Sequence, residues 1–239
     1  MYKRVLLKIS GEALASAEQS AEQSFGIDPR MVEKIAQDIK RVHDGGTEVV
    51  IVVGGGNIYR GLDGAARHAM DRTTSDQMGM LATVINGLAL RSAIESIGIH
   101  CRVMSAISMP TIGEPYSQRR ASRHMEKGRV VICVAGTGNP FFTTDTAAAL
   151  RASELSCDLL LKATKVSGVY TKDPKLSNDA EFLPIISYDD VLRLQLKIMD
   201  ETAFTLIKDN KIPIAVFSIY EPNGFYNTIH GTGTFTLIR

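Results

Sequence analysis

Three glycine-rich segments, each directly after an apolar run, are the parts of this sequence best suited to bind phosphate. They are residues 10–11, 54–57 and 136–139. Glycine lacks a Cβ atom, so such loops can turn backbone N–H groups toward a phosphate at short range. Each loop alone is explained equally well as a tight turn, but the three together indicate phosphate chemistry. Neither GxxxxGK[ST] nor GxGxxG occurs, which excludes a P-loop protein and a dinucleotide-binding fold.

Lys8 interrupts the apolar run 5–9, where a buried parallel strand should be apolar throughout. Because it stands just before a glycine turn, its ammonium group could neutralise a transferring phosphoryl group. The alternative is a lysine that only solvates the strand end. Arg60 follows the second glycine loop, and its guanidinium suits a phosphate, although a lone loop arginine is often only a surface residue.

Two carboxylates at predicted helix starts each have two interpretations. Asp145 could cap its helix, or it could orient Lys8 or the Mg²⁺ that a nucleotide carries. Asp76 could belong only to the capping turn of another helix, or it could accept hydrogen bonds from sugar hydroxyls.

Three further residues near a predicted strand end also remain open. Lys162 and Lys165 could meet nucleotide phosphates or be solvated, and Tyr170 could stack on a base or belong to the core.

Composition favours a single α/β domain over residues 1–239 that binds small molecules. The chain has 239 residues, 44% of them hydrophobic, and a formal charge of +1, which argues against a surface that coats nucleic acid. No apolar stretch approaches the roughly 20 residues that cross a bilayer, and no signal-peptide core is complete. Three cysteines without a CxxC pair suit a reducing compartment, so we expect a cytoplasmic protein without a membrane contact. The five histidines lack metal-ligand spacing.

Apolar β-branched runs alternate with segments of helical period, which predicts a three-layer α/β fold with a mainly parallel central sheet. The last run could be an antiparallel edge strand. A proline after Asp28, a capping box at Thr74 and the pair Ser187 and Asp190 mark helix starts. The polar segments 17–24, a tandem repeat, and 171–181 are predicted to be surface loops. The predicted strands are 5–9, 49–53, 102–104, 130–134, 159–161, 214–217 and 235–238, and the predicted helices begin near 29, 74, 146 and 188.

Nearly the whole chain resembles the bacterial uridylate kinases (UMP kinases) of the amino-acid-kinase superfamily. The lysine-glycine start and the triple glycine are shared across that superfamily, whereas the segments around Asp76 and Asp145 are typical of the uridylate kinase branch. The segments that carry the resemblance are 6–14, 25–28, 54–57 with Arg60, 76–83, 136–145 and 161–170.

The resemblance implies an ATP-dependent nucleoside monophosphate kinase of pyrimidine nucleotide biosynthesis. Such an enzyme transfers the γ-phosphoryl of Mg-ATP to UMP, giving UDP and ADP. By the same resemblance Lys8, Arg60 and Asp145 are catalytic, and no residue is assigned directly to the metal. The implied ATP-binding residues are Lys8, Ile9, Ser10, Gly11, Gly56, Arg60, Thr164, Tyr170 and Asp173. The implied UMP-binding residues are Gly55, Asp76, Thr137, Gly138, Asn139, Pro140, Phe141, Phe142, Thr143 and Thr144.

The family is typically an allosteric homohexamer, inhibited by UTP and activated in many members by GTP. Arg91, Arg102 and Arg129 match basic effector positions of some relatives. The repeat at 17–24 lengthens a stretch that contributes to the GTP site in the family, which leaves GTP activation open. Two other functions are also open: an acyl-phosphate-forming kinase on the same scaffold, and a protein that binds oxyanions or nucleotides without turnover. The nucleotide-type loop 136–145 disfavours the first, and the joint presence of Lys8, Arg60 and Asp145 disfavours the second.

Overall fold

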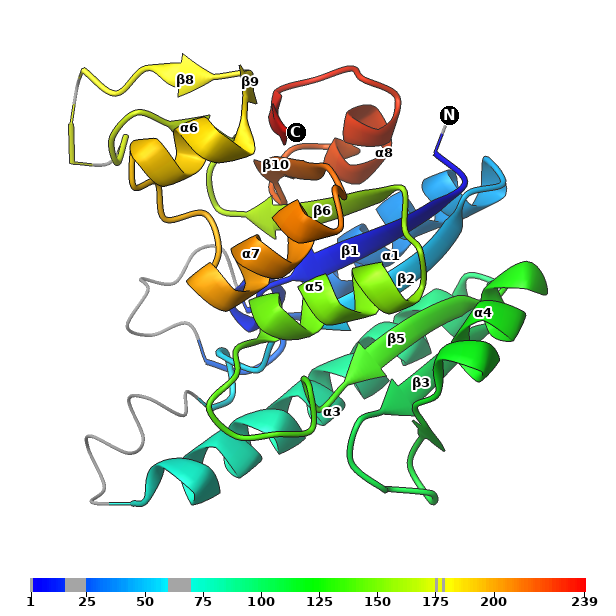
Figure 1. Cartoon of the computed structure of the whole chain (residues 1–239). Helices are drawn as coiled ribbons and strands as arrows, with labels where there is room; N and C mark the ends of the chain where they lie inside the picture. The colour runs from blue at the N-terminus through cyan, green and yellow to red at the C-terminus, as the bar shows by residue number, and fades with distance from the viewer. Residues whose placement is uncertain (1, 16–24, 60–69, 175, 178) are drawn as a thin grey trace.

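The computed structural model describes residues 2–15, 25–59, 70–174, 176–177 and 179–239 (Figure 1). Arg60 and the repeat at 17–24 lie outside these residues. Within them, nine strands form one sheet in the order β4-β3-β5-β2-β1-β6-β10-β11-β9. Neighbouring strands are parallel except for β10 and β11. These strands are β1 (Arg4–Ile9), β2 (Glu48–Val53), β3 (Cys101–Ser105), β4 (Glu114–Pro115), β5 (Val130–Val134), β6 (Leu159–Thr164), β9 (Ile185–Ile186), β10 (Ile214–Ser218) and β11 (Phe235–Ile238).

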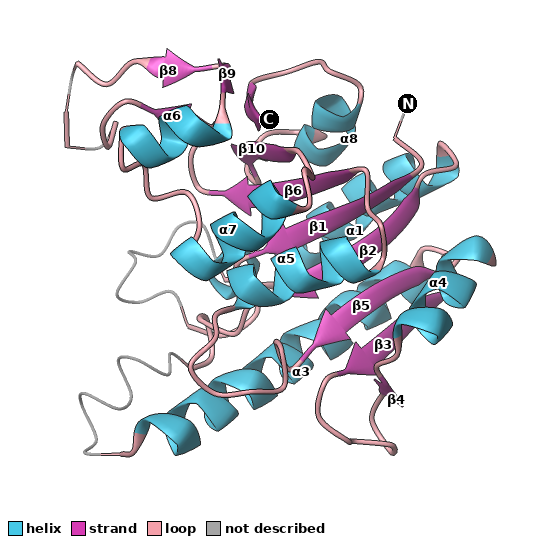
Figure 2. Cartoon of the chain, viewed as in Figure 1, coloured by secondary structure: helices cyan, strands magenta, loops and turns pink. Residues whose placement is uncertain are grey.

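Helices cover both faces of this sheet (Figures 1 and 2), which confirms the prediction of a three-layer α/β fold. Helices α1, α3 and α8 pack on one face, and α4, α5 and α7 on the other. Each face has its own apolar core because strands buried on both sides carry apolar residues in both alternations. The helices are α1 (Pro29–Asp44), α3 (Arg72–Ser96), α4 (Gln118–Glu126), α5 (Thr144–Glu154), α6 (Tyr188–Arg193), α7 (Glu201–Asp209) and α8 (Gly224–Ile229), and η1 (Gly11–Leu14) is a 3₁₀ turn.

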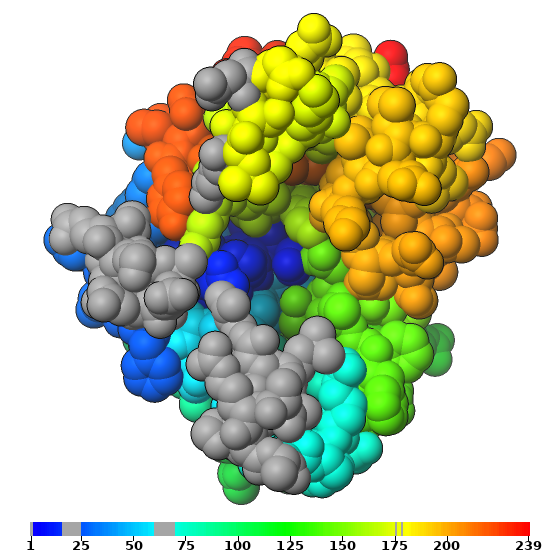
Figure 3. All heavy atoms as spheres, turned by 90° about the vertical axis from the view of Figure 1, so that its left-hand side faces the viewer, coloured from blue at the N-terminus to red at the C-terminus, as the bar shows by residue number. Residues whose placement is uncertain are grey.

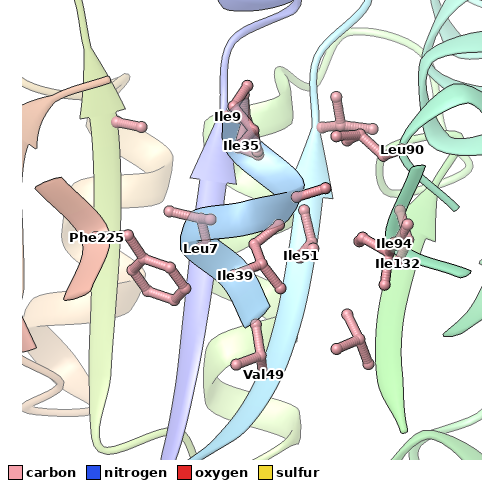
Figure 4. Close-up of a cluster of buried hydrophobic side chains, with 14 of the residues drawn as sticks. Leu7, Ile9, Ile35, Ile39, Val49, Ile51, Leu90, Ile94, Ile132 and Phe225 are labelled. Atoms are coloured by element: carbon pink, nitrogen blue, oxygen red, sulfur yellow. The ribbon is translucent and has the colours of Figure 1, made fainter. Parts of the chain in front are cut away.

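The alternation along β1 decides which way Lys8 points. Leu7 and Ile9 lie in the core beneath α1 and α3, as Figure 4 shows, whereas Leu6 lies in the core beneath α5. Side chains two residues apart share a face, so Lys8 is on the α5 side with Leu6. Strand β6 repeats this pattern, and its Lys162 is the direct register partner of Lys8.

Helix starts follow the capping signals, with one correction. As predicted, Asp28 caps α1 ahead of Pro29, and its side chain accepts a hydrogen bond from Arg30 N. Ser187 likewise caps α6 by accepting one from Asp190 N. Helix α3, however, begins at Arg72, so the predicted start at Thr74 is wrong. The side chain of Asp71 accepts the hydrogen bond from Thr74 N, because a carboxylate one turn earlier is available as the N-cap.

The C-terminal run is antiparallel, as predicted, but β11 is not an edge strand. Strand β9 pairs with its outer side, so the two-residue strand 185–186 forms the edge instead. Too short for a periodic pattern, β9 gives no signal in the sequence. The predicted surface loop 171–181 is closed by a small hairpin of β7 (Val169–Tyr170) and β8 (Phe182–Leu183).

Two further features are the burial of the cysteines and the length and polarity of the helices. The three thiols are buried, and burial raises the pKa of each to about 12, as expected of core cysteines. Across the described ranges, every helix is too short or too polar to pass through a bilayer.

Candidate active site

The three glycine loops meet at the carboxyl ends of β1, β2 and β5. Figure 3 looks into a recess at this edge, with dark blue atoms from the start of the chain at its floor. In open α/β sheets this edge is where ligands bind, beside the N-termini of helices. Tertiary structure thus brings together segments that are far apart in the sequence.

Close backbone approach explains several of the glycines. A Cβ atom on Gly11 would lie 2.5 Å from the amide nitrogen of Gly56, and one on Gly55 would lie 2.7 Å from the Cβ of Ala82. Both distances are shorter than real Cβ contacts, so neither position has room for a side chain. In the third loop Gly136 and Gly138 have φ values of 59° and 83°, which favour glycine.

Two buried asparagines hold the second loop in place. Asn57 belongs to the predicted loop 54–57, whereas Asn86 was not identified from the sequence. Asn57 donates to the carbonyl of Gly26 and to Asn86 Oδ1, and Asn86 donates to the carbonyl of Gly54. Both asparagines are at most 1% exposed. Such a satisfied buried network fixes backbone geometry.

Lys8, Asp145 and Lys162 form a largely buried charge cluster beside these loops. Lys8 Nζ lies 2.7 Å from Asp145 Oδ1, and Lys162 Nζ lies 2.5 Å from Asp145 Oδ2. Lys162 also donates to the carbonyl oxygen of Ile198 at 2.5 Å. Two lysines on adjacent strands therefore flank one carboxylate, and the cluster carries a net positive charge.

Burial and charge act against each other in this cluster. Burial alone would raise the pKa of the Asp145 carboxyl, but the ammonium groups of Lys8 and Lys162 outweigh it and hold that pKa below its ordinary value. Burial lowers the pKa of Lys162, while Asp145 opposes the decrease and Lys8 adds to it. The carboxyl group is therefore ionised at neutral pH.

The helix cap at this site is Thr143 rather than Asp145. The Thr143 hydroxyl accepts hydrogen bonds from the backbone N–H groups of Asp145 and Thr146. The capping interpretation of Asp145 is thus wrong, and its carboxylate instead contacts both lysines. The alternative in which Lys8 only solvates the strand end is also wrong, since Lys8 is 7% exposed and ion-paired.

A cavity of about 440 Å³, here called the glycine-loop cavity, opens between the second and third loops and α3. Eight of the implied nucleotide-binding residues line it, and so do Glu12, Tyr59 and Arg72, which the sequence did not single out. Glu12 lies within the segment 6–14 that carries the resemblance, whereas Tyr59 and Arg72 belong to no motif identified in the sequence. The eight residues are Gly55, Gly56, Asp76, Thr137, Asn139, Phe142, Thr143 and Thr144.

Asp76 joins α3 to the third loop. Its carboxylate accepts from Arg72 Nε at 2.7 Å and from Phe141 N at 2.8 Å. Phe141 has a φ of 72° and is 66% exposed, and the Arg72 guanidinium lies over its ring. Asp76 is therefore a support for the loop as well as part of the cavity wall.

A second cavity, of about 590 Å³, opens at the end of β6 and is called the Tyr170 cavity. Thr164, Tyr170 and Asp173 all line it, so three of the implied ATP-binding residues lie together. Its far wall is the stretch 194–198. Tyr170 packs edge-on against Phe182 and is partly exposed.

The remaining implied residues lie elsewhere. Ile9 is fully buried in the apolar core, so its side chain cannot reach a ligand. Gly138, Pro140 and Phe141 belong to the third loop but not to the lining of the glycine-loop cavity. Ser10 and Gly11 precede and begin η1 beside Gly56. Lys165 pairs with Glu12 at 3.2 Å.

Among the described residues, no group of three or more histidine, cysteine, aspartate or glutamate side chains is arranged to hold a metal ion. The only charged side chains within contact of Asp145 in that part of the chain are the two lysines.

A model of the amino acid kinase family matches residues 3–218. The chain belongs to this family. It is 54% identical to the uridylate kinase of Roseobacter denitrificans, over all of this chain and 96% of that protein, and 53% identical to that of Cereibacter sphaeroides, over all of this chain and 94% of that one. It is thus a kinase of the uridylate kinase branch, and the predicted family is confirmed.

Solved structures agree with this assignment. The UMP kinase of Ureaplasma parvum superposes with a TM-score of 0.92 at 37% identity, covering all of this chain and 99% of that one. The UMP kinase of Bacillus anthracis gives 0.93 at 39% identity, covering 100% and 96%. The amino acid kinase fold of this chain is confirmed along its length.

Proposed function

We propose that this kinase transfers the γ-phosphoryl group of ATP to UMP, giving UDP and ADP in pyrimidine nucleotide biosynthesis. The observation that carries the proposal is the buried Lys8–Asp145–Lys162 cluster at the sheet edge beside the glycine loops. Phosphoryl transfer depends mainly on positioning and charge neutralisation, and this cluster supplies a fixed positive charge.

The two cavities suit the two nucleotides. We assign UMP to the glycine-loop cavity, where Asp76 and the third loop would contact it, and the adenosine of ATP to the Tyr170 cavity. The phosphates of both would then meet near Lys8, Gly11 and Gly56. Arg60 remains a proposed catalytic residue on the strength of its sequence context alone.

The lysines would act without moving far. Asp145 holds both ammonium groups at the sheet edge, so they are oriented before a nucleotide arrives and need little reorganisation during transfer. Their charge opposes the growing negative charge on the transferred group. Magnesium would arrive with the substrate as Mg-ATP, and there it would help to neutralise phosphate charge.

Several wider properties are proposals of the same kind. A single domain over 1–239 is supported by one continuous sheet, which runs from strands near the start of the chain to β11. A cytoplasmic location is supported by the three unpaired thiols. The proposed homohexamer needs contacts between copies of the chain, and an apolar stripe on α3, where Met78, Leu81 and Ile85 are 37%, 45% and 49% exposed, could supply one of them.

Regulation by GTP and UTP is also proposed. Arg91 and Arg102 line a separate cavity of about 380 Å³, as does Glu114. Arg129 is connected to this cavity because its guanidinium bonds to His124, which in turn bonds to Glu114. A guanidinium group suits a nucleotide phosphate. The repeat at 17–24, which the resemblance places near the GTP site, leaves open whether GTP activates.

A coupled ADP-release assay tests the proposed reaction. UMP, CMP, glutamate and aspartate are offered in turn with Mg-ATP, and UMP should give the fastest release. Turnover only with an amino acid would support the acyl-phosphate-forming kinase instead. Tight nucleotide binding by calorimetry without product would support a binding protein.

A further inference from the structure

Asp200, at the start of α7, reaches across to the first turn of α5. Its carboxylate accepts from Thr143 Oγ1 at 2.5 Å and from Thr146 Oγ1 at 3.1 Å. The same side chain caps α7 by accepting from Ala203 N. Two helix starts that lie far apart in the sequence are thus joined through one carboxylate.

In this arrangement the Thr143 hydroxyl donates one hydrogen bond and accepts two. A hydroxyl offers one proton and two lone pairs. Thr143 gives its proton to Asp200, and its oxygen accepts from the N–H groups of Asp145 and Thr146. Because Asp200 takes the proton, the lone pairs face the helix start, which fixes the first turn of α5. That turn carries Asp145, and Thr143 itself lines the glycine-loop cavity.

The same stretch of chain also seats Lys162. The Ile198 carbonyl, only two residues before Asp200, accepts a hydrogen bond from Lys162 Nζ. Residues 194–198 form a wall of the Tyr170 cavity. A short connection between α6 and α7 therefore lines the Tyr170 cavity, contacts Lys162 through the Ile198 carbonyl, and contacts Thr143 in the wall of the glycine-loop cavity through Asp200.

We propose that Asp200 is a positioning residue, and that the stretch 196–200 couples the two cavities. This stretch would fix the positions of Thr143 and Lys162 relative to each other. A nucleotide in the Tyr170 cavity would then favour the arrangement of the glycine-loop cavity that binds UMP. This inference rests on the proposed UMP kinase function. It assigns no direct substrate contact to Asp200.

The substitution Asp200→Ser separates this role from helix capping. Serine is a good N-cap and can still accept from Ala203 N, but it is too short to reach Thr143. Asp28→Ser makes the same change at the N-cap of α1, on the opposite face of the sheet, and serves as the matched control. Both proteins are compared with the wild type by thermal unfolding, by kcat, and by KM for UMP at low and saturating ATP.

We expect Asp200→Ser to unfold within a few degrees of the control and to lose on the order of 10- to 100-fold in kcat, as small misplacements do. Its KM for UMP should no longer depend on ATP. Adding Thr143→Val to Asp200→Ser should lower kcat less than the two single losses multiplied, because both remove one link.

Other outcomes overturn the inference. Kinetic constants of Asp200→Ser equal to those of Asp28→Ser would mean that Asp200 is only a cap, and fully multiplicative losses would mean that it acts apart from Thr143. If the wild type releases no ADP with UMP, the proposed function fails and this inference fails with it. An active wild type with an unaffected Asp200→Ser protein rejects the inference alone.

Discussion

The glycine-loop cavity and the Tyr170 cavity both have lining residues next to the Lys8–Asp145–Lys162 cluster, but their walls differ. The first is built from loops that follow buried strands, and the Asn57–Asn86 network and close glycine contacts hold them. The second is closed by a short hairpin and by a connection in which Leu194 is 47% exposed and Gln195 has a φ of 52°. A wall held by buried polar groups can discriminate strictly between ligands, whereas an exposed wall can adapt.

The difference suggests a division of labour under the proposed function. The acceptor nucleotide would be selected by a fixed surface, and the donor nucleoside would be held by a surface that adjusts around it. Substitutions at the shared lysines should mainly lower kcat. Substitutions in one wall should mainly raise KM for one substrate, measured with the other substrate at saturation.

The largest expected effect is at the boundary between the cavities. Lys8→Ala should lower kcat by roughly a hundred- to a thousandfold, because a preorganised charge on the phosphoryl group is lost. UMP affinity, measured by calorimetry, should stay close to that of the wild type. Unchanged turnover would show that Lys8 is not part of the chemistry, and the comparison of the cavities would lose its common centre.

Asp145→Asn should reduce both turnover and stability. It leaves two lysine ammonium groups without a buried counter-charge, which costs about 3 kcal/mol in the free energy of unfolding. The folded-state pKa of Asp145 is lowered, so its stabilisation is complete above the unfolded pKa of about 4 and is lost as the pH falls through the folded value. Urea unfolding of both proteins should thus show a gap at pH 7 that narrows below about pH 4. A gap that does not change with pH would contradict this role of the carboxylate.

The walls themselves should give smaller and separable effects. Asp76→Asn should raise KM for UMP by about tenfold, because a hydrogen-bonded charge in that cavity is lost, with little change in KM for ATP. Tyr170→Ala should instead raise KM for ATP with little change in KM for UMP, because loss of base stacking costs about 1–3 kcal/mol. Initial-rate kinetics in which either variant changes both constants equally would refute separate walls. Tyr170→Phe, which keeps the ring, is the control.

The smallest expected effect is at the rim of the glycine-loop cavity. Phe141 is 66% exposed, and only its backbone N–H is bonded to Asp76. Phe141→Ser keeps that bond, so kcat/KM for UMP should change by less than about threefold, as for other exposed positions. A tenfold loss in the same kinetic assay would mean that the ring closes over the substrate.

Much of the fold could be predicted from local signals. Asp28 with Pro29 and Ser187 with Asp190 mark helix starts by the chemistry of capping, and the apolar runs mark strands by their β-branched residues. At Thr74 the same reasoning failed, because two competing N-caps lie within one turn and only the backbone path decides between them. The edge strand β9 gave no signal at all, since two residues cannot display a period.

For the active site, the sequence by itself determined which residues were out of place: a lysine inside an apolar strand and glycines after strand ends. Both signals depend only on neighbouring residues in the sequence, and they identified Lys8 and the three loops. Only the tertiary structure decided that Lys162 stands beside Lys8, that Thr143 rather than Asp145 is the cap, and that Asp200 joins the third loop to α7. The physical reason is that strand register and helix docking, which bring distant residues within hydrogen-bond distance, depend on the packing of both apolar cores at once.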